Sequence, residues 1–149
     1  MSAIYFEDIS VGDKTTSKSI SVTKEEIIEF ARKYDPQPFH IDEEAAKKSI
    51  YGGLIASGWH TTALLMRLLV DNMTNMRAGL GSPGCDELRW RLPVRPGDSL
   101  RYESTVIETR KSASRPDMGI IRGDVKLYNQ NDEIVLTLKS TGMIKTRPV

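Results

Sequence analysis

The sequence is poor in several features that define whole classes of protein. It contains one cysteine, Cys85, among 149 residues, so no disulfide bond can form within the chain. Neither sign of charge dominates, because 21 Lys and Arg stand against 20 Asp and Glu for a formal net charge of +1. Nucleic-acid-binding proteins usually carry a clear basic excess. These scarcities exclude a disulfide scaffold and favour a small-molecule partner, with no nucleic acid.

Long apolar runs are also scarce. The longest strongly apolar stretch, residues 61–70, is interrupted by Arg67 and is about half the length that a membrane-spanning helix needs. The first eight residues lack the basic and apolar regions of a secretory signal. We therefore expect no membrane span and a cytoplasmic, reduced protein.

Histidine is the scarcest residue able to do acid-base chemistry near neutral pH, with only His40 and His60. No cluster of ligand-type residues with metal spacing surrounds them, so we expect neither a metal site nor a separate cofactor. The fractions of hydrophobic residues (39%) and charged residues (28%) are close to those of an average globular protein. The length is typical of a single domain, which we place at residues 1–149.

Two helices are indicated by their end signals. The capping-box pattern from Thr23 to Glu26 predicts a helix that continues to about Tyr34, because apolar residues follow at helical spacing. The prolines of residues 35–38 then stop this helix and stiffen the loop. Residues 42–48 are typical of a short exposed helix with acids first and bases last.

A third helix follows the glycine-rich residues 51–58 and is predicted from about Trp59 to Met73. Apolar residues cover nearly all of its faces, and Arg67 is its only charge before Asp71. A helix that is apolar all round must be enclosed by other structure. The rest of the chain therefore has to supply a surface that wraps it.

Four later segments alternate apolar and polar residues with the period of two that predicts half-buried strands. They cover residues 88–92, 100–106, 121–127 and 134–138, and a further strand is expected near residues 14–22. The turn-like connections at 96–98 and 129–132 favour antiparallel hairpins, and residues 111–116 are typical of a longer, more mobile loop. The sequence thus predicts an α+β fold in which an antiparallel sheet wraps a central helix, the hotdog arrangement.

Asp35 and His40 lie five residues apart across the proline-stiffened loop, so a carboxylate and an imidazole can reach the same water molecule. A pair that holds and exchanges protons is what general acid-base chemistry on water requires. Spacing alone also fits a structural role, in which Asp35 caps a turn and His40 begins the next helix. Both interpretations stand at this point.

The segments around this pair resemble those of the MaoC-like dehydratases, also called (R)-specific enoyl-CoA hydratases. The matching motifs are residues 34–42, then Ala45 and Ala46, then 51–58 and 92–100, and the likeness extends from residues 6–13 almost to the C-terminus. Because these motifs occur in the family's order over nearly the whole chain, the resemblance is specific for the family and much less so for a substrate.

The resemblance implies a hotdog-fold homodimer, or a larger assembly of dimers, that adds water to the double bond of an acyl thioester or removes it. The substrate would be a coenzyme A ester, with coenzyme A entering only as part of the substrate. Asp35 and His40 match the family's catalytic dyad, with His40 expected to handle the water and Asp35 the proton at the α carbon. Gly58 matches the oxyanion position, where a backbone N–H at a helix start would face the thioester oxygen.

Further residues are candidates for substrate binding: Gly53, Ser57, Trp59, Arg89 and Arg91. The glycine-rich approach to the helix also fits a simple turn into a packed helix. Trp59 would narrow the acyl pocket or, as is commoner for a tryptophan at the start of a buried helix, pack in the core. Arg89 and Arg91 share a strand face that suits the phosphates of coenzyme A, although a solvated face is the commoner explanation.

The chain departs from the family pattern at three places. Gln37 stands where the loop usually has Asn, and Ser-Gly-Trp at residues 57–59 replaces the frequent His-Gly-Met. Met66 falls eight residues after Gly58, where some hydratases have a serine that supports the dyad aspartate. The threonines at 61 and 62 either supply that hydroxyl or are ordinary first-turn residues, the commoner case.

Two other functions fit the same fold. Some hotdog proteins hydrolyse thioesters, although the loop from Asp35 to His40 argues against this reaction. A hotdog protein that binds acyl thioesters or a partner protein without turnover is also open, because Gln37 and Met66 depart from the usual site.

Overall fold

A computed structural model describes residues 3–73 and 78–149 of the chain. The helical elements of these residues are η1 (Phe6–Asp8), α1 (Lys24–Tyr34), α2 (Pro38–Ile41), α3 (Glu43–Lys47) and α4 (Gly58–Asp71). The strands are β1 (Lys14–Thr16), β2 (Ile20–Ser21), β3 (Gly84–Trp90), β4 (Ser99–Lys111), β5 (Met118–Tyr128) and β6 (Ile134–Lys145).

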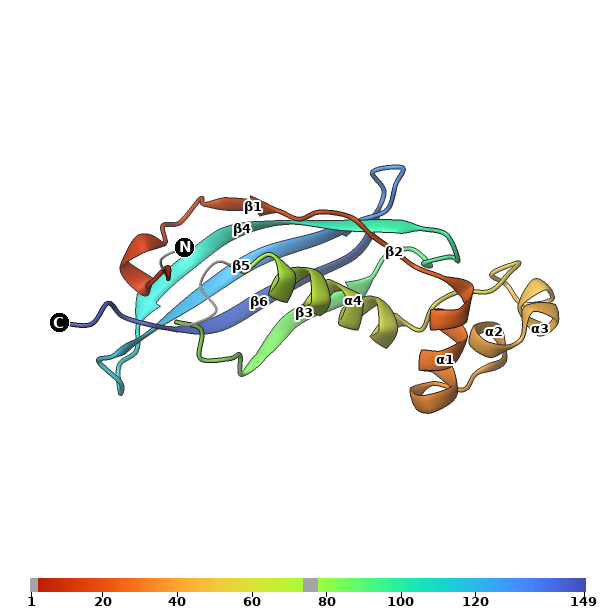
Figure 1. Ribbon diagram of the computed structural model, residues 1–149, viewed down its shortest axis with the longest axis horizontal. Coiled ribbons are helices and arrows are strands. Elements are labelled where there is room, and N and C mark those ends of the chain that lie inside the picture. The colour runs from red at the N-terminus through yellow and green to blue at the C-terminus, as the bar shows by residue number, and fades with distance from the viewer. Residues whose placement is uncertain (1–2, 74–77) are drawn as a thin grey trace.

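The strands form one antiparallel sheet that curves around α4 (Figure 1). β4, β5 and β6 are its long centre, β1 and β2 pair with β4, and β3 pairs with β6 along the other edge. The predicted α+β arrangement, an antiparallel sheet wrapped around a central helix, is confirmed.

The core lies between α4 and the concave face of the sheet. Leu64, Leu65 and Leu68 on one side of α4 pack with Leu127 of β5 and Leu136 of β6. The shorter helices α1 to α3 gather at the end of the sheet where α4 begins (Figure 1). Among the residues that the structure describes, no helix has both the length and the apolar character needed to cross a bilayer.

The other side of α4 is open to solvent in the single chain. Trp59, Met66 and Val70 lie along it at helical spacing, with 59%, 54% and 37% of their surfaces exposed. The expectation that other structure encloses this apolar helix therefore holds for only part of its surface within one protomer.

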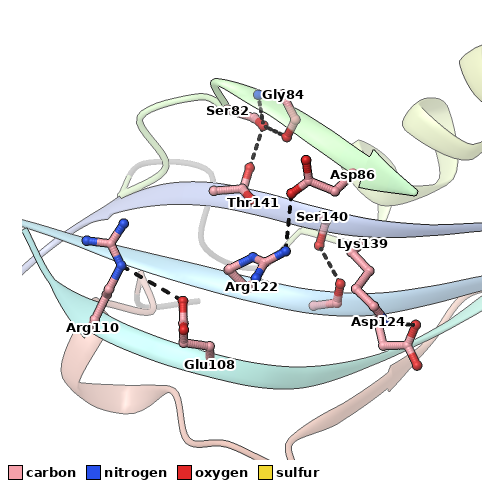
Figure 2. A network of polar contacts seen from close by, with 11 residues as sticks. Ser82, Gly84, Asp86, Glu108, Arg110, Arg122, Asp124, Lys139, Ser140 and Thr141 are labelled. Carbon is pink, nitrogen blue, oxygen red and sulfur yellow. Dashed lines mark hydrogen bonds and ion pairs between the residues drawn. The ribbon is translucent and has the colours of Figure 1, made fainter. Parts of the chain in front are cut away.

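The face of the sheet that is turned away from α4 is polar. Arg122 of β5 reaches Asp86 of β3 at 3.2 Å, and Lys139 of β6 pairs with Asp124 at 3.4 Å (Figure 2). These charges alternate along the strands with buried residues such as Val125, which point toward α4. Exposed ion pairs contribute only about 0–1 kcal/mol each, so their main effect is to keep this face solvated.

Element boundaries differ from the sequence expectations at several places. The strand expected at 88–92 is β3 and ends at Trp90, and the strand expected at 134–138 continues as β6 to Lys145. The strand expected near residues 14–22 is divided into β1 and β2. β4 runs on through a bulge between Val106 and Glu108, which interrupts its alternation, and the expected loop corresponds to residues 112–117. α4 ends at Asp71 instead of Met73 because Asn72 takes the C-cap position.

Candidate functional site

Asp35 and His40 are brought together by the break between α1 and α2. Asp35 is the C-cap of α1, with φ −156° and ψ 65°, which turns the chain out of the helix. Pro38 begins α2 at a position where a helix does not need its missing N–H. The His40 N–H then donates to the Gln37 carbonyl at 2.9 Å. The stiff connection thus aims the carboxylate and the imidazole at one point.

The two side chains form a close and mostly buried pair. His40 Nε2 lies 3.3 Å from Asp35 Oδ2, and the two side chains are 6% and 19% exposed. On the other side of the ring, Nδ1 donates to the Ile55 carbonyl at 2.8 Å, because a carbonyl oxygen can only accept. That bond fixes the tautomer, so a neutral His40 turns the lone pair of Nε2 toward the carboxylate. A proton on Nε2, or a water donating to both groups, satisfies this contact.

Asp35 is held as a carboxylate by the donors around it. Gln37 Nε2 donates to Oδ1 at 2.6 Å. Burial is the largest influence and raises the pKa of Asp35. Gln37, the Ser57 hydroxyl and His40 together outweigh this effect, so the pKa of Asp35 lies below its usual value. Asp35 is therefore ionised at neutral pH.

Gly58 occupies the first position of α4, close to the pair. Ser57 is the N-cap, and its hydroxyl accepts the Trp59 N–H at 3.3 Å. First-turn N–H groups have no partner within their own helix, and no acceptor among the described residues bonds to the Gly58 N–H. Ser57, the preceding residue, is one of the groups that lower the pKa of Asp35, which places the start of α4 near the dyad. The predicted catalytic residues therefore share one place in the fold.

A tryptophan from the edge strand covers Gly58. Trp90 ends β3, and a Cβ atom at position 58 would stand 2.5 Å from its ring. Trp90 Nε1 donates to Thr62 Oγ1 at 3.0 Å, which ties the ring to the first turn of α4. Trp59, which the sequence more readily placed in the core, is exposed and packs edge-on against Trp90 with centroids 5.1 Å apart. Sequence reasoning missed Trp90, whose one signal was a large aromatic at an inward strand position.

We expect Gly58→Ala to destabilise the protein by about 1–3 kcal/mol, because the added methyl group overpacks against the Trp90 ring. The Gly58 backbone is not in the left-handed region, so the clash is the cause. Chemical denaturation measures the loss. Gly142→Ala is the matched control, since a Cβ there meets no atom within 4 Å and should cost nothing. Equal stability of the two variants would contradict the close contact.

The other predicted binding residues lie further out. Arg95 holds the glycine-rich loop, because its Nη2 donates to the Tyr51 carbonyl at 2.6 Å. Gly53 packs against the same guanidinium, since a Cβ atom on Gly53 would stand 3.3 Å from Arg95 Nη1. Arg89 and Arg91 lie on the sheet face opposite α4, where Arg91 Nε donates to Thr137 Oγ1 at 3.1 Å. The structure does not bring these two arginines to the dyad within one protomer. Their contact with phosphate stays a prediction.

His60 packs between helices. Its ring is 6% exposed and stacks on Phe30 of α1, with centroids 4.7 Å apart. Nδ1 has no hydrogen-bond partner among the described residues. Burial lowers the pKa of His60, partly offset by nearby Glu26, so the ring is neutral at pH 7. Within residues 3–73 and 78–149, no three His, Cys, Asp or Glu side chains are grouped to hold a metal ion.

Comparison with known families decides what kind of protein carries this arrangement. The model of the MaoC like domain matches residues 9–123, a range that includes Asp35, His40, Gly58 and Trp90. The chain belongs to the MaoC-like dehydratase family. The resemblance seen in the sequence motifs is confirmed, and with it the hotdog fold.

Relatives within this family match most of the chain. The crystal structure of a MaoC-like dehydratase from Rhodospirillum rubrum superposes with a TM-score of 0.91 at 42% identity, covering 99% of this chain and 100% of that one. The uncharacterized protein YdeM of Bacillus subtilis (strain 168) is 30% identical over 140 residues, 93% of this chain and 97% of its own. The 3-hydroxybutyryl-CoA dehydratase of Methylorubrum extorquens is 30% identical over 106 residues, 70% of this chain and 65% of its own.

The departures of this MaoC-like chain from the family pattern have structural explanations. Gln37, in place of the usual Asn, still reaches Asp35. Met66 is 54% exposed on the open side of α4 and has no hydroxyl. The threonines at 61 and 62 are ordinary first-turn residues whose hydroxyls donate to the carbonyls of the preceding turn. The hydroxyl that lowers the pKa of the dyad aspartate belongs to Ser57.

Proposed function

We propose that this MaoC-like protein adds water to the double bond of a 2-enoyl thioester of coenzyme A and, in reverse, dehydrates the 3-hydroxyacyl thioester. The observation that carries the proposal is the Asp35–His40 contact. With Nδ1 donating to Ile55, a neutral His40 turns the lone pair of Nε2 toward an ionised carboxylate oxygen 3.3 Å away, and a water can donate a hydrogen to each. Such a water is oriented for attack and has a base beside it.

The proposed reaction moves one proton around this pair. His40 Nε2 takes a proton from the water as the water oxygen bonds to the β carbon. The double-bond electrons move onto the thioester, leaving an enolate. The proton then passes across the contact to Asp35 Oδ2 and on to the α carbon. One O–H bond is replaced by one C–H bond and the hydroxyl stays on the β carbon, so the sum of the steps is the addition of water.

Gly58 would stabilise the enolate. Its N–H and the positive end of the α4 dipole would face the thioester oxygen, where the negative charge develops. A donor of this kind contributes about 10²- to 10³-fold to the rate. Trp59 lies next in sequence, 59% exposed beside Trp90, and we place it at the wall of the acyl pocket.

An assay with a short trans-2-enoyl-CoA tests the proposal when the conjugated double bond and free thiol are followed together. We expect the double bond to disappear without release of thiol. Release of thiol would indicate a hotdog thioesterase instead. Saturable binding with neither change would indicate a protein that binds acyl thioesters without turnover. Either of these results overturns the proposal.

We also propose that the protein works as a homodimer or an assembly of dimers. Among the described strands, none pairs with the outer side of β3, and Trp59, Met66 and Trp90 expose apolar surface beside it. Pairing two such edges about a two-fold axis would cover both features. Sedimentation at micromolar concentration should therefore show a dimer or a multiple of it. A monomer under those conditions would contradict this expectation.

A further inference from the structure

Gly58 is held less firmly by its own helix than the residues that follow it. A glycine has no side chain to restrict its backbone, so it has more conformational freedom to lose than any other residue. Gly58 is also the first residue of α4, where N–H groups have no partner within the helix. A donor stabilises developing charge best when its direction is fixed before the charge forms. A contact from outside the helix is therefore needed to restrain the Gly58 backbone.

Trp90 supplies two such contacts. A Cβ atom at position 58 would stand 2.5 Å from the indole, so the ring lies directly against the Gly58 backbone. The indole N–H donates to Thr62 Oγ1 at 3.0 Å, and the Thr62 hydroxyl donates its own proton to the Gly58 carbonyl at 3.0 Å. The Thr62 hydroxyl is thus both acceptor and donor. It connects the indole to the Gly58 carbonyl through a chain of two hydrogen bonds.

The sheet holds Trp90 itself in place. Trp90 is the last residue of β3 and pairs with Leu136 of β6 in the antiparallel register. The N–H of the next residue, Arg91, donates to the Val135 carbonyl at 2.8 Å. Trp59 packs edge-on against the indole, with ring centroids 5.1 Å apart. The indole is therefore a fixed point from which the start of α4 can be restrained.

We infer that Trp90 is a positioning residue, which acts through Gly58 and keeps the Gly58 N–H aimed at the thioester oxygen. The inference rests on the proposed function, in which this N–H stabilises the enolate. The negative charge is present in the transition state and not in the bound substrate, so a misdirected donor lowers kcat with little change in KM.

Trp90→Phe tests the inference because it keeps an aromatic ring against Gly58 and removes only the indole N–H. We expect kcat for a short enoyl-CoA to fall by about 3- to 10-fold with KM nearly unchanged, the effect of one neutral hydrogen bond. Trp90→Leu also removes the ring and should lower kcat further, by about 10- to 100-fold. That loss stays within the roughly 10²- to 10³-fold contribution of an oxyanion donor.

Tyr102→Phe is the matched control. Tyr102 of β4 contacts the other end of α4, where its hydroxyl accepts a hydrogen bond from Asn72 Nδ2 at 2.8 Å. Each Phe variant removes one hydrogen bond between the sheet and α4, so both should lower thermal stability. Only Trp90→Phe should lower kcat.

Thr62→Val breaks the same chain of hydrogen bonds from the helix side. Its combination with Trp90→Phe should lose no more kcat than the larger of the two single losses, because both changes remove one connection. Fully additive losses would overturn the connection through Thr62.

The infrared carbonyl band of bound butyryl-CoA reports the Gly58 donor without turnover. This thioester has no double bond to hydrate, and carbon-13 at the thioester carbon separates its band from those of the protein. A hydrogen bond to the carbonyl lowers its stretching frequency. The bound band should lie below the free one in the wild type and in Tyr102→Phe. In Trp90→Phe it should move back toward the free position.

These outcomes separate the inference from the proposed function. A wild-type kcat or a wild-type band in Trp90→Phe would overturn the positioning role, even where the wild type hydrates enoyl-CoA. Equal losses of kcat in Trp90→Phe and Tyr102→Phe would overturn it as well. A wild-type band at the free position would do the same, whatever the hydration assay shows. A band that moves only in Trp90→Phe, in a protein that hydrates no enoyl thioester, would support the positioning role and refute the proposed function.

Discussion

Replacing Asp35 by Asn should lower kcat for hydration by about 10²- to 10⁴-fold, the contribution of a well-placed acid-base group. Asn has nearly the same shape and can still accept the Gln37 hydrogen bond, which is 2.6 Å long in the wild type. It can neither receive the proton from His40 nor pass it to the α carbon. Steady-state kinetics with a short enoyl-CoA measure the loss, and KM should change far less than kcat.

Asp117→Asn is the matched control for this change. Asp117 lies in the connection between β4 and β5, where its side chain is 72% exposed and pairs with Arg115 at 3.7 Å. This connection is at the opposite end of the sheet from α1 (Figure 1). The control variant should keep the wild-type kcat. Full activity in Asp35→Asn would contradict the assignment of the dyad.

A second large loss is expected at His40. Gln at this position still has an amide N–H that can donate toward the Ile55 carbonyl, the acceptor of Nδ1 at 2.8 Å. It has no group that takes a proton from water near neutral pH, so kcat should fall by about 10²- to 10⁴-fold. Because His40 is 4% exposed, the unfolding free energy must be measured beside the kinetics and activity compared per folded molecule.

The other histidine is the natural control for His40→Gln. His60 is 6% exposed and stacks on Phe30, so His60→Gln disturbs packing without removing a group of the proposed site. We expect a loss of stability of about 0.5–3 kcal/mol and an unchanged kcat for the folded fraction. A fall in kcat as large as that of His40→Gln would contradict the placement of proton transfer at His40.

Much of the fold could be predicted because local signals and burial agree. The capping hydroxyl of Thr23 begins α1 as its pattern indicates, and the alternation in four later segments marks the strands that line the core. The alternation of apolar and polar residues did not predict the strands where the sheet is irregular or only partly buried. The bulge after Val106 interrupts the alternation, so the second half of β4 was not predicted. Beyond Leu138 most residues of β6 are half-exposed, so that part of the strand has no clear alternation. α2, with four residues, is too short to show a helical period.

The candidate catalytic residues could be predicted from the sequence, but the contacts that hold them in place could not. Asp35, His40 and Gly58 stand in motifs that are visible in the chain. The residues that pack against them come from distant segments of the chain, as Trp90 does against Gly58. A hydroxyl that supports Asp35 was sought at the threonines within α4, whereas the hydroxyl that lowers the pKa of Asp35 belongs to the N-cap, Ser57. Which of several neighbouring hydroxyls affects a carboxylate is decided by the folded arrangement of the segments, which sequence spacing does not reveal.

The claim that the Asp35–His40 pair adds water across a double bond is tested most directly with oxygen-18-labelled water. The wild type is incubated with a short trans-2-enoyl-CoA, and the product is analysed by mass spectrometry. The expected product is an intact thioester that has gained a single labelled hydroxyl on the β carbon, formed at a rate that collapses in Asp35→Asn. Label in a carboxylic acid with release of free coenzyme A, or no labelled product from the folded wild type, would contradict the account.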